Sequence, residues 1–102
     1  MVNTISSSEL IEKLAAGADI TVIDVRTPEE VAEGKIIGAT NINIFDADFA
    51  DKIAEYDKSK TYAMVCRSGA RSGQACMHME SIGFENINNV GGGMMGWVGE
   101  VE

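Results

Sequence analysis

The amino-acid sequence predicts an α/β domain with a mainly parallel central sheet of about five strands, flanked by helices on both faces. Segments rich in β-branched residues alternate along the chain with segments whose apolar residues recur at helical spacing. The clearest strand segments are apolar nearly throughout, as strands covered on both faces are. With 102 residues, the chain is long enough for one such unit, and we expect a single domain over residues 1–102.

The predicted helices begin at recognisable capping residues. Ser6 and Glu9 form a capping box ahead of the first helix. Thr27 caps a second, short helix, and Pro28 stands at its first helical position. Helical spacing of apolar residues indicates the remaining helices, which cover residues 46–56, the stretch between Ser72 and Gly83, and the neighbourhood of Trp97.

The predicted strands cover residues 20–25, 39–44, 61–65 and 85–90. The third of them runs directly into Cys66. In parallel α/β sheets, ligands bind beyond the carboxyl ends of the strands. Cys66 therefore stands where such a fold binds its ligand.

Composition excludes several classes of protein. Sixteen acidic residues against eight basic ones, a net charge of −8, argue against binding to nucleic acid or to an anionic membrane surface. No apolar run approaches the ~18 residues of a spanning helix, and no secretion signal is visible, so we expect a cytoplasmic protein with reduced cysteines. His78 is the only histidine and the two cysteines are far apart in sequence, so neither a metal nor another cofactor is expected.

The segment after Cys66 has the residues of an anion site. From Thr61 to the end of the chain, Arg67 and Arg71 are the only arginines or lysines, and three small residues separate them. Two cations that close to a cysteine would form a local anion site, whereas the alternative is two solvated arginines on a loop. Gly69 permits a positive φ, and we expect Ser72 to cap the next helix.

Such a loop should stabilise a thiolate at Cys66. Successive backbone N–H groups would point inward, and the following helix would add the positive end of its dipole. Lowering a cysteine pKa from ~8.5 to ~6 requires about 3.4 kcal/mol of differential stabilisation. A helix terminus supplies ~0.3–2 kcal/mol, so the arginines and the N–H groups must supply the rest.

Residues 66–72 resemble the active-site loop of single-domain rhodaneses, the thiosulfate:cyanide sulfurtransferases. Further motifs stand in the family's order: residues 24–30, residues 34–42, and Gly92–Gly93 followed by Trp97. The resemblance covers roughly residues 20–97 and implies a rhodanese-like fold. It also implies that the chain is an enzyme, a thiosulfate sulfurtransferase.

The resemblance implies a two-step reaction. The Cys66 thiolate attacks the outer sulfur of thiosulfate or a similar small anionic donor, sulfite leaves, and a cysteine persulfide remains. Cyanide, a thiol or a sulfur-relay protein then accepts the sulfur. Arg67 and Arg71 would hold the sulfonate oxygens, and Asp24 and Arg26 would pair with loop residues and position them. The persulfide would lie among the backbone amides of Arg67, Ser68, Gly69, Ala70, Arg71 and Ser72.

Two other functions remain as alternatives. Phosphatases and arsenate reductases use Cys-x5-Arg, but only four residues separate Cys66 from Arg71 here, which makes a smaller ring of N–H groups. A non-catalytic rhodanese-like binding module is the other alternative, although such modules usually lose the cysteine.

Some residues outside the cysteine loop allow more than one structural interpretation. Cys76 is expected to pack in the core, or alternatively to resolve an oxidised Cys66. Met94 and Met95 would fill the core or form an apolar rim over the pocket. Residues 29–33, with three glutamates, are expected to form a solvated helix face.

Overall fold

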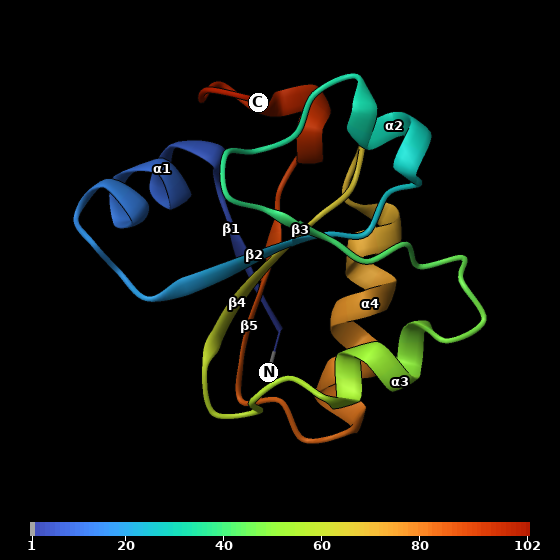
Figure 1. The fold of residues 1–102 in the computed structure, drawn as a ribbon. Coiled ribbons are helices and arrows are strands. Elements are labelled where there is room, and N and C mark those ends of the chain that lie inside the picture. Colours follow the sequence, from blue (N-terminus) through green and yellow to red (C-terminus); the bar gives the residue numbers. More distant parts are fainter. Residues whose placement is uncertain (1) are drawn as a thin grey trace.

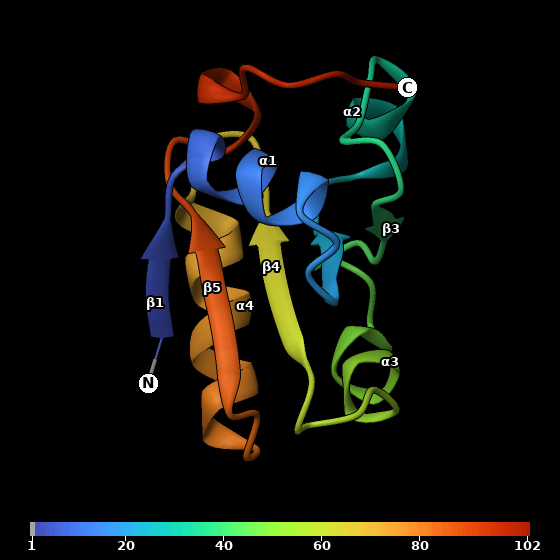
Figure 2. The same cartoon turned by 90° about the vertical axis from the view of Figure 1, so that its left-hand side faces the viewer.

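Five parallel strands form one sheet in the order β1-β5-β4-β2-β3 in the computed structural model, which describes residues 2–102. The strands are β1 (Val2–Ile5), β2 (Ile20–Asp24), β3 (Thr40–Asn41), β4 (Thr61–Val65) and β5 (Asn86–Val90). The strand β4 lies in the centre, and all strands point toward the same edge (Figure 2). The predicted parallel sheet of about five strands is confirmed.

Helices cover both faces of the sheet, as predicted. Helix α1 (Ser7–Ala15) lies on one face, and α3 (Phe49–Ala54) and α4 (Ala70–Ser81) lie on the other (Figures 1 and 2). The short helix α2 (Pro28–Ala32) and the 3-10 helix η1 (Gly93–Gly96) lie beyond the carboxyl ends of the strands. Within residues 2–102, no helix is both long and apolar enough to span a membrane.

The sequence-based prediction missed β1 and overestimated the second strand. In β1 only Ile5 is buried, so the segment lacks an apolar run, and its pairing with β5 is what makes it a strand. The predicted strand over residues 39–44 reduces to the two residues of β3. The amides of Ile42 and Ile44 still bond the carbonyls of Asp24 and Val25, at 2.9 and 3.1 Å, so the chain stays beside β2 without a regular ladder.

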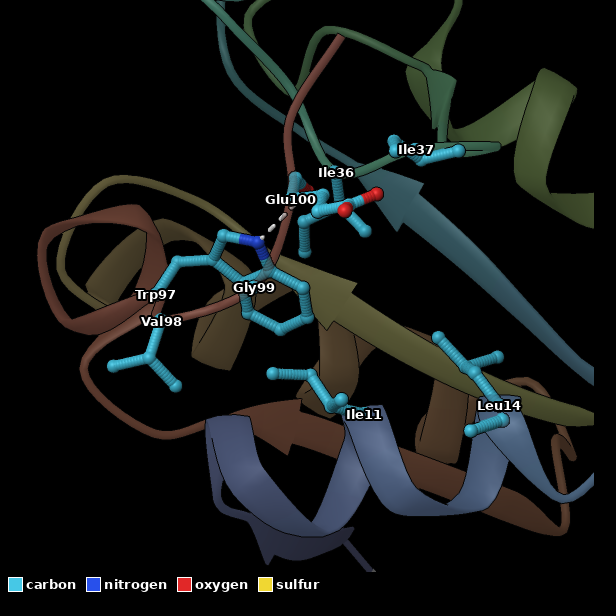
Figure 3. A pocket seen from close by; sticks show the side chains of 9 residues that line it. Ile11, Leu14, Ile36, Ile37, Trp97, Val98, Gly99 and Glu100 are labelled. Carbon is cyan, nitrogen blue, oxygen red and sulfur yellow. Dashed lines mark hydrogen bonds between the residues drawn. The ribbon is translucent and has the colours of Figure 1, made fainter.

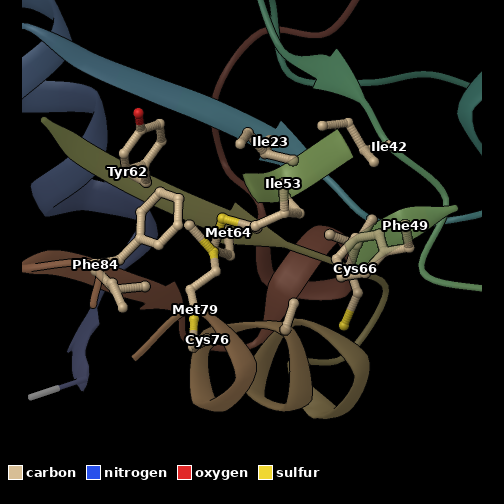
Figure 4. Packing of buried hydrophobic residues seen from close by; sticks show 13 residues of the cluster. Ile23, Ile42, Phe49, Ile53, Tyr62, Met64, Cys66, Cys76, Met79 and Phe84 are labelled. Carbon is tan, nitrogen blue, oxygen red and sulfur yellow. The ribbon is translucent and has the colours of Figure 1, made fainter. Parts of the chain in front are cut away.

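The core is divided between the two faces by the alternation of β4. Tyr62, Met64 and Cys66 belong to the apolar cluster under α3 and α4, together with Ile53 and Met79 (Figure 4). The intervening residues of β4 face the second cluster, under α1, whose buried members are Ile5, Leu10, Val22, Ile36, Ala39, Ala63, Val65 and Val90. Because side chains alternate along a strand, the side chain of Cys66 lies on the face of the sheet that α4 covers.

Candidate active site

Cys66 lies between the end of β4 and the beginning of α4. The chain turns at Gly69, whose φ of 105° lies in the left-handed region, as the sequence predicted. Gly69 is itself the N-cap of α4, and the helix begins at Ala70. The prediction that Ser72 caps this helix is wrong, because the left-handed glycine already completes the turn and Ser72 falls inside the first turn.

Ser72 instead points its hydroxyl at the cysteine. Its Oγ lies 3.3 Å from Cys66 Sγ, and the backbone N–H of Gly69 donates to the same sulfur at 3.0 Å. Burial raises the pKa of Cys66, but these donors, with the backbone N–H groups of Ser68 and Ser72, outweigh it. The pKa of Cys66 therefore lies below its ordinary value of 9.0. We call residues 66–72 the cysteine cradle.

Asn89 on β5 forms hydrogen bonds with two residues of the cysteine cradle. The Ser72 hydroxyl shares its one hydrogen between Cys66 Sγ and Asn89 Oδ1, which lies 2.6 Å away, and Asn89 Nδ2 donates to the carbonyl of Gly69 at 3.1 Å. One amide side chain thus joins Gly69 to Ser72. Sequence reasoning missed Asn89, although three asparagines among the five residues of β5 were a signal of polar partners.

The backbone of residues 91–95, which follow β5, packs directly against the cysteine cradle. The N–H of Met94 donates to the Cys66 carbonyl at 2.8 Å, and the N–H of Met95 donates to the Arg67 carbonyl at 3.0 Å. Gly93 has a φ of 52°, and a Cβ atom there would lie 2.4 Å from the Cys66 carbonyl oxygen. Only glycine permits this approach, so the Gly92–Gly93 motif fixes the position of the cysteine.

Arg71 pairs with Glu30 of α2. Its two terminal nitrogens donate to the two carboxylate oxygens at 2.7 and 2.9 Å, a bidentate ion pair between helices far apart in sequence. Glu30 also accepts from the Thr27 N–H in a capping box, at 3.2 Å. The Arg71 hydrogen bonds, opposed by some burial, lower the pKa of Glu30 to about 2. The expectation that Glu30 belongs to a merely solvated helix face is wrong.

Asp24 and Arg26 bond to each other and to α2 instead of to the cysteine cradle. The guanidinium of Arg26 donates to both Asp24 carboxylate oxygens at 2.7–3.0 Å, and both side chains are buried. Its remaining donors reach the carbonyls of Glu30 and Gly34, at 3.3 and 2.8 Å. The predicted pairing with loop residues is therefore corrected: Arg26 uses its donors to hold α2, which carries Glu30.

A cavity of about 310 Å³ opens beside the cradle. We call it the mouth cavity, and its lining residues are Arg26, Glu30, Glu33, Arg67, Met94 and Met95. Arg67 is exposed and pairs with no carboxylate among residues 2–102. Met95 is 71% exposed at the rim, whereas Met94 also packs against the core under α1, so both interpretations of the methionines hold.

Cys76 lies deeper in the same apolar cluster, on α4 beside Met79 (Figure 4). It is fully buried, in agreement with a packing role. Burial, with a smaller contribution from Cys66, raises the pKa of Cys76 to about 12. In the part of the chain that the structure describes, no group of three or more histidines, cysteines or carboxylates could hold a metal ion.

A second cavity, of about 660 Å³, lies away from the cysteines (Figure 3). The Trp97 ring and Ile11 of α1 line it, and Trp97 Nε1 donates to the Glu100 carbonyl at 3.2 Å. Its other lining residues are Leu14, Ala15, Ile36, Ile37, Val98, Gly99 and Glu100. Neither thiol and no arginine lines this cavity, so it is separate from the cysteine cradle.

The family model described as "Rhodanese-like domain" matches residues 6–100. The chain is 43% identical over 101 residues to YtwF of Bacillus subtilis, a protein named as a predicted sulfurtransferase. The match covers 99% of this chain and 95% of that protein. A protein of Allochromatium vinosum named "Sulfurtransferase" is 36% identical, covering 95% of this chain and 89% of that protein.

Solved structures agree with the fold. The rhodanese-like domain protein from Staphylococcus aureus superposes with a TM-score of 0.87 at 34% identity, covering 98% of this chain and 96% of that one. SSP1007 from Staphylococcus saprophyticus gives a TM-score of 0.87 at 33% identity, covering 98% of both chains. The similarity thus extends over the whole sheet, the cysteine cradle included.

Proposed function

Because the chain belongs to the rhodanese-like domain family, we propose that it is a sulfurtransferase that carries sulfane sulfur as a persulfide on Cys66. Relatives named as sulfurtransferases support sulfur transfer in general. The observation that carries the finer proposal is the set of donors on Cys66 Sγ, from the Gly69 N–H and the Ser72 hydroxyl. These donors favour a thiolate, and the thiolate is the nucleophile that sulfur transfer needs.

In the first step, the Cys66 thiolate attacks the outer sulfur of a donor such as thiosulfate. A bond forms between Sγ and that sulfur, the bond from that sulfur to the sulfite sulfur breaks, and the electron pair leaves with sulfite. The charges balance, because a thiolate and a thiosulfate dianion become a persulfide anion and a sulfite dianion. No proton has to move, so the reaction needs hydrogen-bond donors around the sulfur but no general acid.

In the second step, an acceptor takes the outer sulfur and returns the Cys66 thiolate. Cyanide would leave as thiocyanate, and a thiolate acceptor would leave as a persulfide. The backbone N–H of Gly69 and the amides beside it would donate to the outer persulfide sulfur, which is bonded to Cys66 Sγ and lies in front of the same helix N-terminus. Thiosulfate as the donor remains part of the proposal: a relative named thiosulfate sulfurtransferase, PspE of Escherichia coli, is 34% identical over 70 residues.

Intact mass spectrometry tests the reaction class. We expect the protein to gain one sulfur atom after incubation with thiosulfate and to lose it when cyanide is added. Cys66→Ser should gain none, and Cys76→Ser should behave like the wild type, because only Cys66 has donors on its sulfur. A wild-type protein that gains no sulfur from thiosulfate or from a thiosulfonate would contradict the proposal and favour the non-catalytic binding module.

A further inference from the structure

The charges that line the mouth cavity cancel. Arg26 and Arg67 contribute two positive charges, and Glu30 and Glu33 contribute two negative ones. Two of these charges are already paired, Arg26 with Asp24 and Glu30 with Arg71, both at 2.7 Å. Arg67 and Glu33 are left as the charges of the lining that have no ion-pair partner among residues 2–102. A donor that approaches Cys66 therefore meets a neutral entrance with a thiolate behind it, where the sequence predicted a cationic one.

Arg71, the second arginine of the cradle, does not line the mouth cavity. Both of its terminal nitrogens are turned to Glu30, at 2.7 and 2.9 Å, and its guanidinium carbon lies 5.7 Å from the centre of the Phe45 ring. The two side chains of the pair are only 22% and 29% exposed, so solvent screens the pair less than it would a surface pair. Among residues 2–102, Arg67 is left as the one arginine of the cradle without a carboxylate.

We propose that Glu30 sets the donor preference of Cys66: by occupying Arg71 it selects sulfane donors with one negative charge over the thiosulfate dianion. Such donors are thiosulfonates, in which an organic group replaces a charged oxygen of thiosulfate, and the persulfide anions of uncharged thiols. This inference rests on the proposed function, since it concerns which donor loads Cys66. Glu30 acts through Arg71, so it is a positioning residue.

The physical reason is that repulsion from the Cys66 thiolate grows with the donor's charge. A dianion is repelled about twice as strongly as a monoanion at the same distance, and it gains twice as much from any cation that becomes available. With Arg71 held by Glu30, Arg67 is the one cation of the lining that has no ion-pair partner in the described part of the chain, and Glu33 opposes its charge. When Arg71 is released from Glu30, the rates with both kinds of donor should rise. If the rate with a monoanion rises by a given factor, the rate with thiosulfate should rise by about the square of that factor.

Glu30→Gln is the decisive variant, because glutamine at this position keeps the capping box with Thr27 while removing the charge. We expect the second-order rate constant of persulfide formation to rise roughly tenfold with thiosulfate and about threefold with benzenethiosulfonate. The gain should appear as a lower KM, because the donor carries the same charge before and during the reaction.

Two matched variants separate Arg71 from general electrostatics. Glu29→Gln removes the same charge one residue away, at an exposed position outside the mouth cavity, and should change both rates by less than about twofold. In an Arg71→Gln background, Glu30→Gln should lose most of its selective effect. Thermal unfolding of each variant checks that the fold is intact.

The dependence on ionic strength gives a further test. Because the net charge of −8 repels any anion, the wild type must be compared with Glu30→Gln, and the rate with thiosulfate should rise with ionic strength more steeply in the wild type. A rate with thiosulfate that falls with ionic strength would mean that Arg71 is available to donors, and would overturn the inference.

The outcomes distinguish this inference from the proposed function. An unchanged ratio of the two rates in Glu30→Gln, an equal change in Glu29→Gln, or an undiminished effect without Arg71 would overturn the role of Glu30 while sulfur transfer stands. A wild-type protein that accepts sulfur from neither donor would overturn both.

Discussion

The two cysteines of this protein lie ten residues apart, and both are fully buried in one apolar cluster, yet their acidities shift in opposite directions. Burial raises the pKa of Cys76 to about 12, whereas hydrogen bonds to Cys66 outweigh its burial and lower its pKa. Cys66 follows the last residue of β4 and faces backbone N–H groups, whereas Cys76 lies inside α4, where the helix uses the backbone donors.

The comparison shows that exposure does not decide which thiol ionises more readily. What differs is the number of N–H and O–H groups aimed at the sulfur: Gly69 and Ser72 donate to Cys66 Sγ, and no donor to Cys76 is found among residues 2–102. A buried thiolate is stable only where such donors replace water.

Removing each thiol in turn gives the largest expected difference. Cys66→Ser should abolish sulfur transfer, because a serine hydroxyl does not ionise near neutral pH and cannot hold a sulfane sulfur. Cys76→Ser should keep most of the wild-type rate. Steady-state formation of thiocyanate from thiosulfate and cyanide measures both, and comparable losses in the two variants would assign Cys76 a part in turnover.

Disturbing the cover of Cys66 should have the next largest effect. Gly93→Ala would bring a Cβ atom 2.4 Å from the Cys66 carbonyl oxygen at a left-handed φ of 52°, so we expect a loss of roughly 2–4 kcal/mol in the free energy of unfolding. Sulfur transfer should fall as well, because the cradle must move.

Gly96→Ala is the matched control for this prediction. No atom lies within 4 Å of a Cβ built at Gly96, and its φ is not positive. Its free energy of unfolding should change by less than about 1 kcal/mol. Urea unfolding followed by tryptophan fluorescence measures both variants, and equal losses would mean that the close approach at Gly93 is not what constrains the loop.

The shifted pKa values of Cys66 and Cys76 predict opposite pH dependences of the free energy of unfolding. Above pH 9 the unfolded chain ionises Cys76 but the folded chain does not, so the wild type should lose about 1.4 kcal/mol per pH unit from pH 9 toward 12. Cys76→Ser should escape this loss. Cys66 acts in the other direction, because its lowered pKa adds stability above the ordinary value of 9.0, and that stability is lost as the pH falls through the folded pKa.

Urea unfolding at pH 8 and at pH 10.5 checks this expectation. The wild type should lose roughly 2 kcal/mol more than Cys76→Ser between these two pH values. Parallel losses in the two proteins would show that Cys76 ionises in the fold as freely as outside it.

Ser72→Ala should have the smallest effect. The hydroxyl lies 3.3 Å from Cys66 Sγ but only 2.6 Å from Asn89 Oδ1, so it is shared, and its removal should raise the pKa of Cys66 while the backbone N–H groups still lower it. The pH dependence of alkylation by iodoacetamide, in a Cys76→Ser background, reports this shift. Ser68→Ala, which keeps the backbone N–H, should leave the profile unchanged, and a profile unmoved by Ser72→Ala would leave the backbone as the whole cause.

The sequence predicted those features that are local in the chain. The strand before Cys66, the left-handed turn at Gly69 and the cap at Thr27 all follow from residues a few positions apart, and all are confirmed. The position of Cys66 at the carboxyl edge follows from the parallel sheet, which alternating elements already predicted.

What the sequence could not provide are the contacts between distant segments. Glu30 and Arg71 are 41 residues apart, and only the packing of α2 against the start of α4 brings them together. Asn89 reaches the cradle because β5 lies beside β4. Residues that a linear motif marks as free for substrate, such as Arg71, can therefore have been taken up by a partner that no spacing rule identifies.

The most direct test of the central claim is the pH dependence of persulfide formation, located in the chain by mass spectrometry of peptides. After short exposure to thiosulfate at a series of pH values, the added sulfur should be found on the peptide that holds Cys66, with a midpoint below pH 9.0. The peptide that holds Cys76 should carry none at any pH below about 12. Sulfur on Cys76, or a Cys66 midpoint at or above 9.0, would contradict the claim that donated hydrogen bonds make one buried thiol reactive and leave the other inert.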